Sequence, residues 1–192
     1  MQPQYIMTYD QESGVKAGGG EYVMEGGAYI CEILSAKFVE ANTGSNGIEF
    51  SIKTDEGLKS DFLTVYYMKK NKDPTTGGQS CINAMMGILK LPGFTFSQSG
   101  NDYVSPEFKG KRIGLFLQKT LYKKQDGSDG FKFDIRVPFH PESRKTLKEL
   151  ISGSNAETIE RMTNNYKDKI ETSNSQSFNS ASQQHQHDPY NW

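Results

Sequence analysis

The sequence is poor in the residues that form most metal sites and disulfide frameworks. Its 192 residues contain only two cysteines and three histidines. Cys31 and Cys81 lie far apart and outside any paired metal-binding spacing, so we expect buried thiols in a reducing compartment. His185 and His187 form a pair without a third ligand, which is a poor metal site. We therefore expect neither a metal nor another cofactor.

Long apolar runs are also lacking. No segment approaches the roughly 20 apolar residues of a membrane-spanning helix. The first residues have neither the basic start nor the apolar stretch of a signal peptide. We therefore expect a soluble, cytoplasmic protein without a membrane partner.

Catalytic motifs are scarce as well. The glycine runs at residues 18–20 and 77–78 lack the Lys-Ser/Thr pair that follows a phosphate-binding loop. The acids near turns, such as Glu49 and Asp55, do not have the clustered spacing of a metal-dependent nuclease. We therefore predict that the protein is not an enzyme.

Neither sign of charge is in excess, since 22 Lys and Arg stand against 23 Asp and Glu, for a formal net charge of −1. This balance excludes a globally basic nucleic-acid binder but allows a local basic patch. Such an asymmetry occurs in residues 109–136, where basic residues outnumber acidic ones by eight to three.

This basic segment has the pattern of two β-strands joined by a Gly/Asp turn. Because side chains alternate along a strand, its first strand has one apolar face, formed by Ile113, Leu115, Leu117 and Leu121. The opposite face carries Arg112, Phe116, Gln118, Tyr122 and Lys124. Aromatic rings that stack on bases, set among cations that meet phosphates, are typical of a single-strand nucleic-acid groove. The alternative is a basic hairpin whose aromatics cover a neighbouring strand.

The second strand of this hairpin alternates in the same way. Lys132 and Arg136 are expected to point outward. The residues expected in the core are Phe131, Phe133, Ile135 and Val137.

The rest of the chain divides into four parts by composition. Residues 1–20 predict a flexible arm, 21–140 a β domain, 141–171 a helical extension and 172–192 a disordered tail rich in Ser, Asn and Gln. The β domain has strand patterns at 28–40, 48–53 and 58–68 and in the hairpin. Ser80 is expected to cap a helix at 81–91, and the extension predicts helices at 143–151 and 156–170.

The predicted tail ends in an aromatic tip. Asp188, Tyr190 and Trp192 follow a polar tether, which is an arrangement suited to binding a pocket on a partner protein. The alternative is a tail without a selected role.

Five strands with a helix between the third and the fourth match the element order of an OB-type barrel, which binds single strands. The runs 27–33, 42–45 and 47–50, together with 109–114 and the aromatic hairpin 122–133, resemble small bacteriophage single-stranded DNA-binding proteins of replication and recombination modules. The resemblance implies a strand held on the barrel face and a tail that recruits replication or recombination proteins. It also implies residence in the host cytoplasm.

The candidate nucleic-acid-binding residues are cations and aromatics of the hairpin and of the end of the third strand. They are Tyr66, Tyr67, Lys69, Lys70, Lys72, Lys111, Arg112, Phe116, Tyr122, Lys123, Lys124, Lys132 and Arg136. If the third strand is extended, one of its two adjacent tyrosines must point outward. For each aromatic, packing in the core or across strands is the alternative.

The sequence thus predicts a sequence-independent single-stranded DNA-binding protein. The rival interpretation is a non-enzymatic interaction module or virion structural module without a nucleic-acid role. DNA and RNA are not distinguished, because stacking and phosphate contacts occur with both. Exposed edge strands would permit a homodimer.

Overall fold

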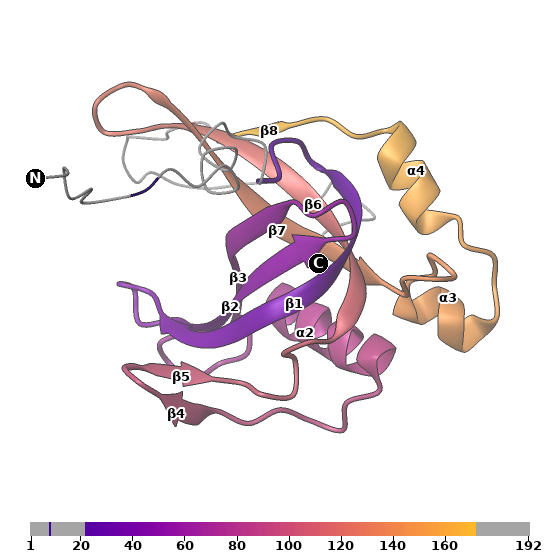
Figure 1. Ribbon diagram of the computed structural model, residues 1–192, viewed down its shortest axis with the longest axis horizontal. Helices are drawn as coiled ribbons and strands as arrows, with labels where there is room; N and C mark the ends of the chain where they lie inside the picture. Colours follow the sequence, from indigo (N-terminus) through magenta and orange to yellow (C-terminus); the bar gives the residue numbers. More distant parts are fainter. Residues whose placement is uncertain (1–7, 9–21, 172–192) are drawn as a thin grey trace, which may run out of the picture.

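The computed structural model describes residue 8 and residues 22–171, and within them the protein is mainly β, as predicted (Figure 1). The elements are, in chain order, β1 (Gly27–Glu40), β2 (Asn46–Thr54), β3 (Lys59–Met68), α2 (Thr76–Leu89), β4 (Ser97–Ser99), β5 (Asp102–Val104), β6 (Arg112–Lys123), β7 (Asp129–Phe139), α3 (Leu147–Ser152), α4 (Thr158–Asn164) and β8 (Lys169–Ile170). The predicted long strands and the helix after the third of them are confirmed.

The long strand β1 organises the sheet. It pairs antiparallel with β2 along one edge and with β6 along the other, and β3 and β7 extend the sheet from β2 and β6. The hairpin β4–β5 joins β1 through Lys37 and Val104, and β8 pairs with β6 in parallel. Within the described residues β3 and β7 form no strand pair, so hydrogen bonds do not close the sheet.

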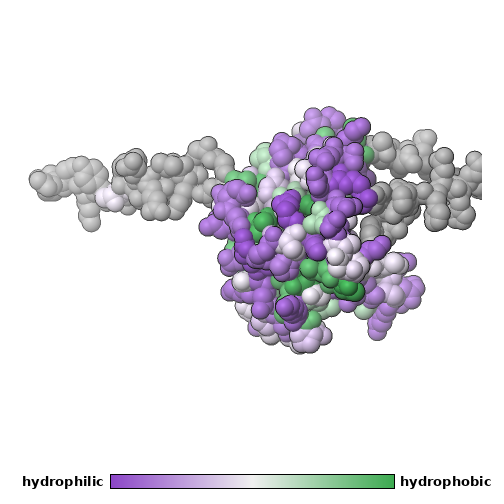
Figure 2. Space-filling model, turned by 90° about the vertical axis from the view of Figure 1, so that its right-hand side faces the viewer, coloured by the Kyte–Doolittle hydropathy of each residue, from purple (hydrophilic) through white to green (hydrophobic). Residues whose placement is uncertain are grey.

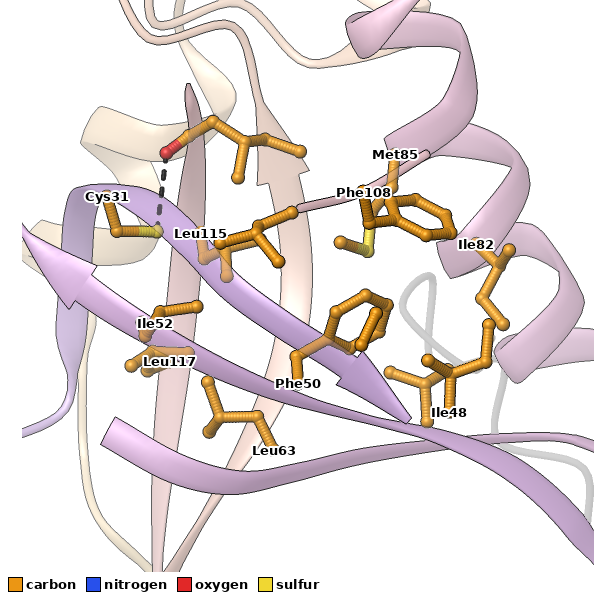
Figure 3. Packing of buried hydrophobic residues seen from close by; sticks show 14 of the residues in the cluster. Cys31, Ile48, Phe50, Ile52, Leu63, Ile82, Met85, Phe108, Leu115 and Leu117 are labelled. Carbon is orange, nitrogen blue, oxygen red and sulfur yellow. Dashed lines mark hydrogen bonds between the residues drawn. The ribbon is translucent and has the colours of Figure 1, made fainter. Parts of the chain in front are cut away.

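The core lies between the curved sheet and α2. Alternate residues of the strands point inward, among them Phe50 and Leu115, and α2 adds Ile82, Met85 and Ile88 from one face (Figure 3). Full burial of an aliphatic or aromatic side chain contributes about 1.5–3 kcal/mol. This face of the sheet is therefore buried in the core, so a binding surface must lie on another part of the protein.

Helix α2 begins five residues earlier than predicted, because Ser80 is not its cap. The helix starts at Thr76, with Thr75 at the N-cap position, and the Thr75 hydroxyl donates to the Tyr66 carbonyl. A Cβ atom at Gly78 would lie 1.8 Å from the same carbonyl oxygen, so only glycine allows this close approach of helix and strand. Gly77 and Gly78 are thus part of the first helical turn.

The predicted hairpin is present as β6 and β7, but a β-bulge interrupts its alternation. Phe116 pairs with Val137 and Leu117 pairs with Ile135, which leaves Arg136 as the extra residue. Beyond the bulge Val137 faces the same side as Phe116 and packs in its cluster. The expectation that Val137 shares the core face of Ile135 is therefore wrong.

The extension after β7 covers the outer face of β1 and β6. Ile159 of α4 completes a second apolar cluster with Phe116 and Phe139, flanked by Met162 and Tyr166. Viewed from the side that bears α3 and α4, the surface is mostly hydrophilic, with apolar patches in its lower half (Figure 2). The second predicted helix ends early, at Asn164, and the chain continues along β6 as β8.

Glu149 joins the two helices of this extension. Its carboxylate accepts hydrogen bonds from Thr146 in a capping box and from the backbone N–H groups of Glu157 and Thr158 at the start of α4. Burial opposes ionisation of this carboxyl, but these hydrogen bonds outweigh burial and lower its pKa to about 2.

In the described part of the chain, no helix has the length and apolar character needed to cross a membrane. The predicted arm, apart from residue 8, and the predicted tail with Asp188, Tyr190 and Trp192 lie outside the described residues.

Candidate nucleic-acid interface

Phe116 was expected on an exposed strand face, and this expectation is wrong. The residue is 1% exposed, and its ring lies 6.0 Å from the ring of Tyr166. The cause is the C-terminal extension, which covers the face of β6 that alternation had assigned to solvent. Phe116 therefore packs as in the alternative interpretation and offers no surface to a base.

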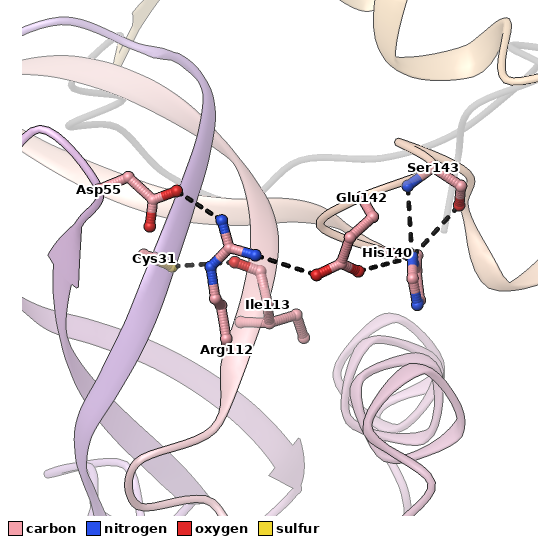
Figure 4. Close-up of polar contacts among 7 residues, drawn as sticks. All are labelled: Cys31, Asp55, Arg112, Ile113, His140, Glu142 and Ser143. Carbon is pink, nitrogen blue, oxygen red and sulfur yellow. Dashed lines mark hydrogen bonds and ion pairs between the residues drawn. The ribbon is translucent and has the colours of Figure 1, made fainter.

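Arg112 is exposed but engaged by two carboxylates. Its guanidinium lies 2.6 Å from Asp55 and 2.9 Å from Glu142 (Figure 4). The hydrogen bond with Asp55 is the main cause that raises the pKa of Arg112 above its ordinary value. Glu142 also lies 3.2 Å from His140. Arg112 thus ties the β2–β3 turn to β6 and to the segment after β7.

The end of the β6–β7 hairpin near its turn carries four of the predicted binding residues, Tyr122, Lys123, Lys124 and Lys132. Acidic residues neutralise two of these lysines. Lys123 lies 2.6 Å from Asp129, and Lys132 lies 3.1 Å from Glu171, just after β8. The Lys132 ammonium is also 5.9 Å from the ring centroid of the half-buried Tyr122. Lys124 is exposed and has no ion pair with any described residue.

The other two predicted cations of this region lie apart from the hairpin end. Lys111 precedes β6, and Arg136 occupies the bulge of β7. Both are exposed, and neither forms an ion pair within residues 22–171.

The two adjacent tyrosines at the end of β3 point to opposite faces, as predicted for an extended strand. Tyr67 packs on the core, 6.3 Å from the ring of Phe94, and burial raises its pKa. Tyr66 is 42% exposed. A Cβ atom at Gly47, its partner on β2, would lie 2.9 Å from the Tyr66 ring, so the glycine lets the ring lie against the strand.

The loop after β3 carries three lysines, which follow Tyr66 by three, four and six residues. Its one carboxylate, Asp73, accepts a hydrogen bond from the Asn71 amide at 2.7 Å. Lys69, Lys70 and Lys72 are exposed and form no ion pair in the part of the chain that the structure describes. We call residues 69–72, together with Tyr66, the lysine loop cluster.

The lysine loop cluster also reaches the β1–β2 turn. A Cβ atom at Gly44 would lie 2.9 Å from the Lys70 side chain, and Gly44 has a φ of 82°. The turn thus leaves room for the Lys70 stem to extend across it. Lys70 thereby lies against the β1–β2 turn and the exposed Tyr66 ring against the start of β2, and Lys69 and Lys72 belong to the same loop as Lys70.

Phe131 and Phe62 are among the exposed aromatic residues that sequence reasoning missed. Phe131 was expected in the core, but it is 39% exposed and lies under the Lys119 ammonium at 5.1 Å. Phe62 was not singled out, and it is 76% exposed on β3. A signal for Phe62 was present, because Leu63 and Val65 are core residues and alternation then turns Phe62 outward with Tyr66.

Within the described residues, neither the cysteines nor the possible metal ligands are arranged as a reactive site. Both cysteines are free, and burial raises the pKa of the Cys31 thiol to about 12, so it stays protonated. No group of three His, Cys, Asp or Glu side chains within residues 22–171 is arranged to hold a metal ion.

The chain matches no known protein-family model, and no curated protein is significantly similar to it. The functional argument therefore depends on the geometry of the surface. Of the candidate residues, Tyr66 lies at the end of β3 and the three lysines lie in the loop that follows it. The β6–β7 hairpin separately groups Tyr122, Lys123, Lys124 and Lys132.

Proposed function

We propose that the protein binds single-stranded DNA without strong sequence preference, through a surface centred on the lysine loop cluster. The observation that carries the proposal is the exposed Tyr66 ring at the end of β3, followed by a loop with three lysines that have no ion pair among the described residues. Rings of this kind stack on bases of any sequence, and lysines of this kind meet phosphates. We place this activity in phage DNA replication or recombination, with the tail residues Asp188, Tyr190 and Trp192 recruiting partner proteins.

The strand order supports an OB-type barrel as the scaffold. In the proposed barrel β1, β2 and β3 form one meander, β6 and β7 form the hairpin, and α2 follows the third strand. OB-type barrels bind oligonucleotides on the face of their second and third strands and on the adjoining loops. Tyr66 is on β3, and Lys70 lies against the β1–β2 turn, which are the corresponding positions.

Stacking on Tyr66 and phosphate contacts by the loop lysines would together give useful affinity for a single strand. One stacked base contributes about 1–3 kcal/mol, and each phosphate that a lysine neutralises steepens the dependence of binding on salt by about 0.7 in the logarithmic slope. The three loop lysines alone would account for a slope of about −2.

One observation favours a second candidate, an interaction module without a nucleic-acid role. Two lysines of the hairpin arm, Lys123 and Lys132, already have acidic partners, and the whole chain is nearly neutral. An interaction module needs no aligned free cations, so the neutralised lysines of the β6–β7 hairpin favour this second candidate.

The test compares variants of the cluster by fluorescence anisotropy with a labelled dT oligonucleotide. We expect Y66A to weaken binding about five- to 150-fold at constant salt slope. The triple variant K69A/K70A/K72A should lose affinity and reduce the steepness of the slope by about 2. K148A, which removes an exposed lysine of α3, is the matched control and should bind normally. Normal binding by both cluster variants would contradict the proposed site.

A further inference from the structure

Phe62 combines an unfavourable backbone with an uncovered ring. Its φ is 61°, in the left-handed region that bulky residues rarely adopt, and its side chain is 76% exposed. The left-handed backbone costs stability, and an exposed ring recovers little of it through burial. Folding alone therefore gives no reason for a phenylalanine at this position.

A β-bulge produces this arrangement. Ile52 pairs with Ser60 and Phe50 pairs with Leu63, so two residues of β3, Asp61 and Phe62, stand opposite one residue of β2. Bulges redirect side chains and are common beside functional sites. Leu63, the next residue, points into the core (Figure 3). Phe62 points to the opposite, outer face and is exposed.

The surroundings of Phe62 leave its ring open. The neighbouring outward positions hold small hydroxyl side chains, with Ser51 opposite the bulge, Ser35 paired to Ser51 on β1, and Thr64 two residues further along β3. Tyr66 lies four residues from Phe62 on the same face, about 13 Å along an extended strand. Two exposed rings thus follow β3, with Thr64 between them on that strand and Glu49 opposite Thr64 on β2.

This end of the face is not basic. Lys37 lies 3.0 Å from Asp102, and the charges of Glu49 and Asp61 also act on it. A ligand over Phe62 would therefore be held by contact with the ring, whereas its charged groups would be met by the lysine loop cluster.

We propose that Phe62 is a second base-stacking platform, which extends the Tyr66 site along β3 for an unpaired nucleobase. The inference rests on the proposed function, since it names a further contact for the same single strand. Unpaired bases present the π-face that such a ring requires, and bases within a duplex do not.

The test exploits the left-handed backbone, because F62G removes the ring and also relieves the strain. F62G should raise the Tm, since glycine adopts a positive φ without a steric cost. It should nevertheless weaken binding of a dT oligonucleotide about five- to 150-fold, with an unchanged salt slope because no cation is lost. F62L should lose affinity in the same way, and F62Y should retain it.

The control is Y103A, which removes an aromatic residue that is 53% exposed on β5. Asp102 pairs with Lys37 on the outer face, so its neighbour Tyr103 points to the other side, and Y103A should bind normally. Normal binding by F62G and F62L, together with weakened binding by Y66A, would overturn the role of Phe62 and leave the proposed function intact. An equal loss in Y103A would also overturn it. No binding by the unaltered protein would overturn both.

Discussion

The Tyr166 hydroxyl accepts a hydrogen bond from the backbone N–H of Lys119 at 3.0 Å and donates one to Asp168 at 2.7 Å. This contact fixes the end of the C-terminal extension on β6, directly before β8 begins. It helps to hold the extension over one face of β6. The residues on that face therefore secure the extension and are not available to a ligand.

We predict that Y166F destabilises the protein without changing its affinity for single strands. The variant keeps the ring against Phe116 but leaves the N–H of Lys119 without its acceptor, which costs about 1–3 kcal/mol. Urea denaturation measures the loss. A change in dT affinity greater than twofold would show instead that the extension takes part in binding.

The pH dependence of stability should report on Glu149. Because the folded state lowers the pKa of this carboxyl to about 2, its contribution is fully present above the unfolded value near 4.5 and is lost as the pH falls toward 2. We expect E149Q to be less stable at neutral pH, by about 1–3 kcal/mol, and to lose less stability than the unaltered protein between pH 4.5 and 2.

Thermal denaturation at several pH values makes this comparison. E40Q is a suitable control, because Glu40 is exposed at the end of β1, outside the α3–α4 junction, and forms no ion pair with any described residue. Parallel pH profiles for E149Q and the unaltered protein would contradict the assigned role of Glu149.

Removal of the acid beside Lys132 should strengthen binding. E171Q frees the Lys132 ammonium from its ion pair, so a phosphate can meet it without competition. We expect a higher affinity for dT at low salt and a salt slope steeper by about 0.7. E160Q on α4 serves as the control for the change in net charge. If both variants behave alike, Lys132 does not contact the strand.

Arg112 should prove a structural residue, although the sequence placed it in the binding site. R112Q breaks the contacts with Asp55 and Glu142, so we expect a lower Tm and an unchanged dT affinity. K111A, which removes a neighbouring exposed cation, is the comparison. If R112Q lost as much affinity for dT as K69A/K70A/K72A, Arg112 would have to be a contact of the bound strand, and its structural assignment would be wrong.

Alternation and turn residues were sufficient to predict the long strands, because β1, β2, β3, β6 and β7 each direct alternating apolar residues into the main core. They could not predict the side of β6 on which Phe116 lies buried, since the cover comes from Ile159, more than 40 residues later. The start of α2 was missed for a related reason, because the glycine at position 78 serves a contact with the carbonyl of Tyr66.

The candidate site was predicted in part. Local pattern required one of Tyr66 and Tyr67 to point outward and grouped both with the loop lysines, because these residues are adjacent in the chain. The structure identifies Tyr66 as the outward one. The ion pairs that engage Arg112 and Lys132 involve Asp55, Glu142 and Glu171, which lie at long sequence distance, so local charge counts could not find them. The bulge at Phe62 depends on how β3 pairs with β2, and the sequence of β3 alone does not give this pairing.

The most direct measurement is the anisotropy of a labelled dT oligonucleotide titrated with the unaltered protein at several salt concentrations, with duplex DNA as competitor. Our account predicts tight binding at low salt, a logarithmic salt slope of about −2 or steeper, and little displacement by duplex. Absence of binding at low salt, or equal displacement by duplex, would contradict the central claim and favour an interaction module.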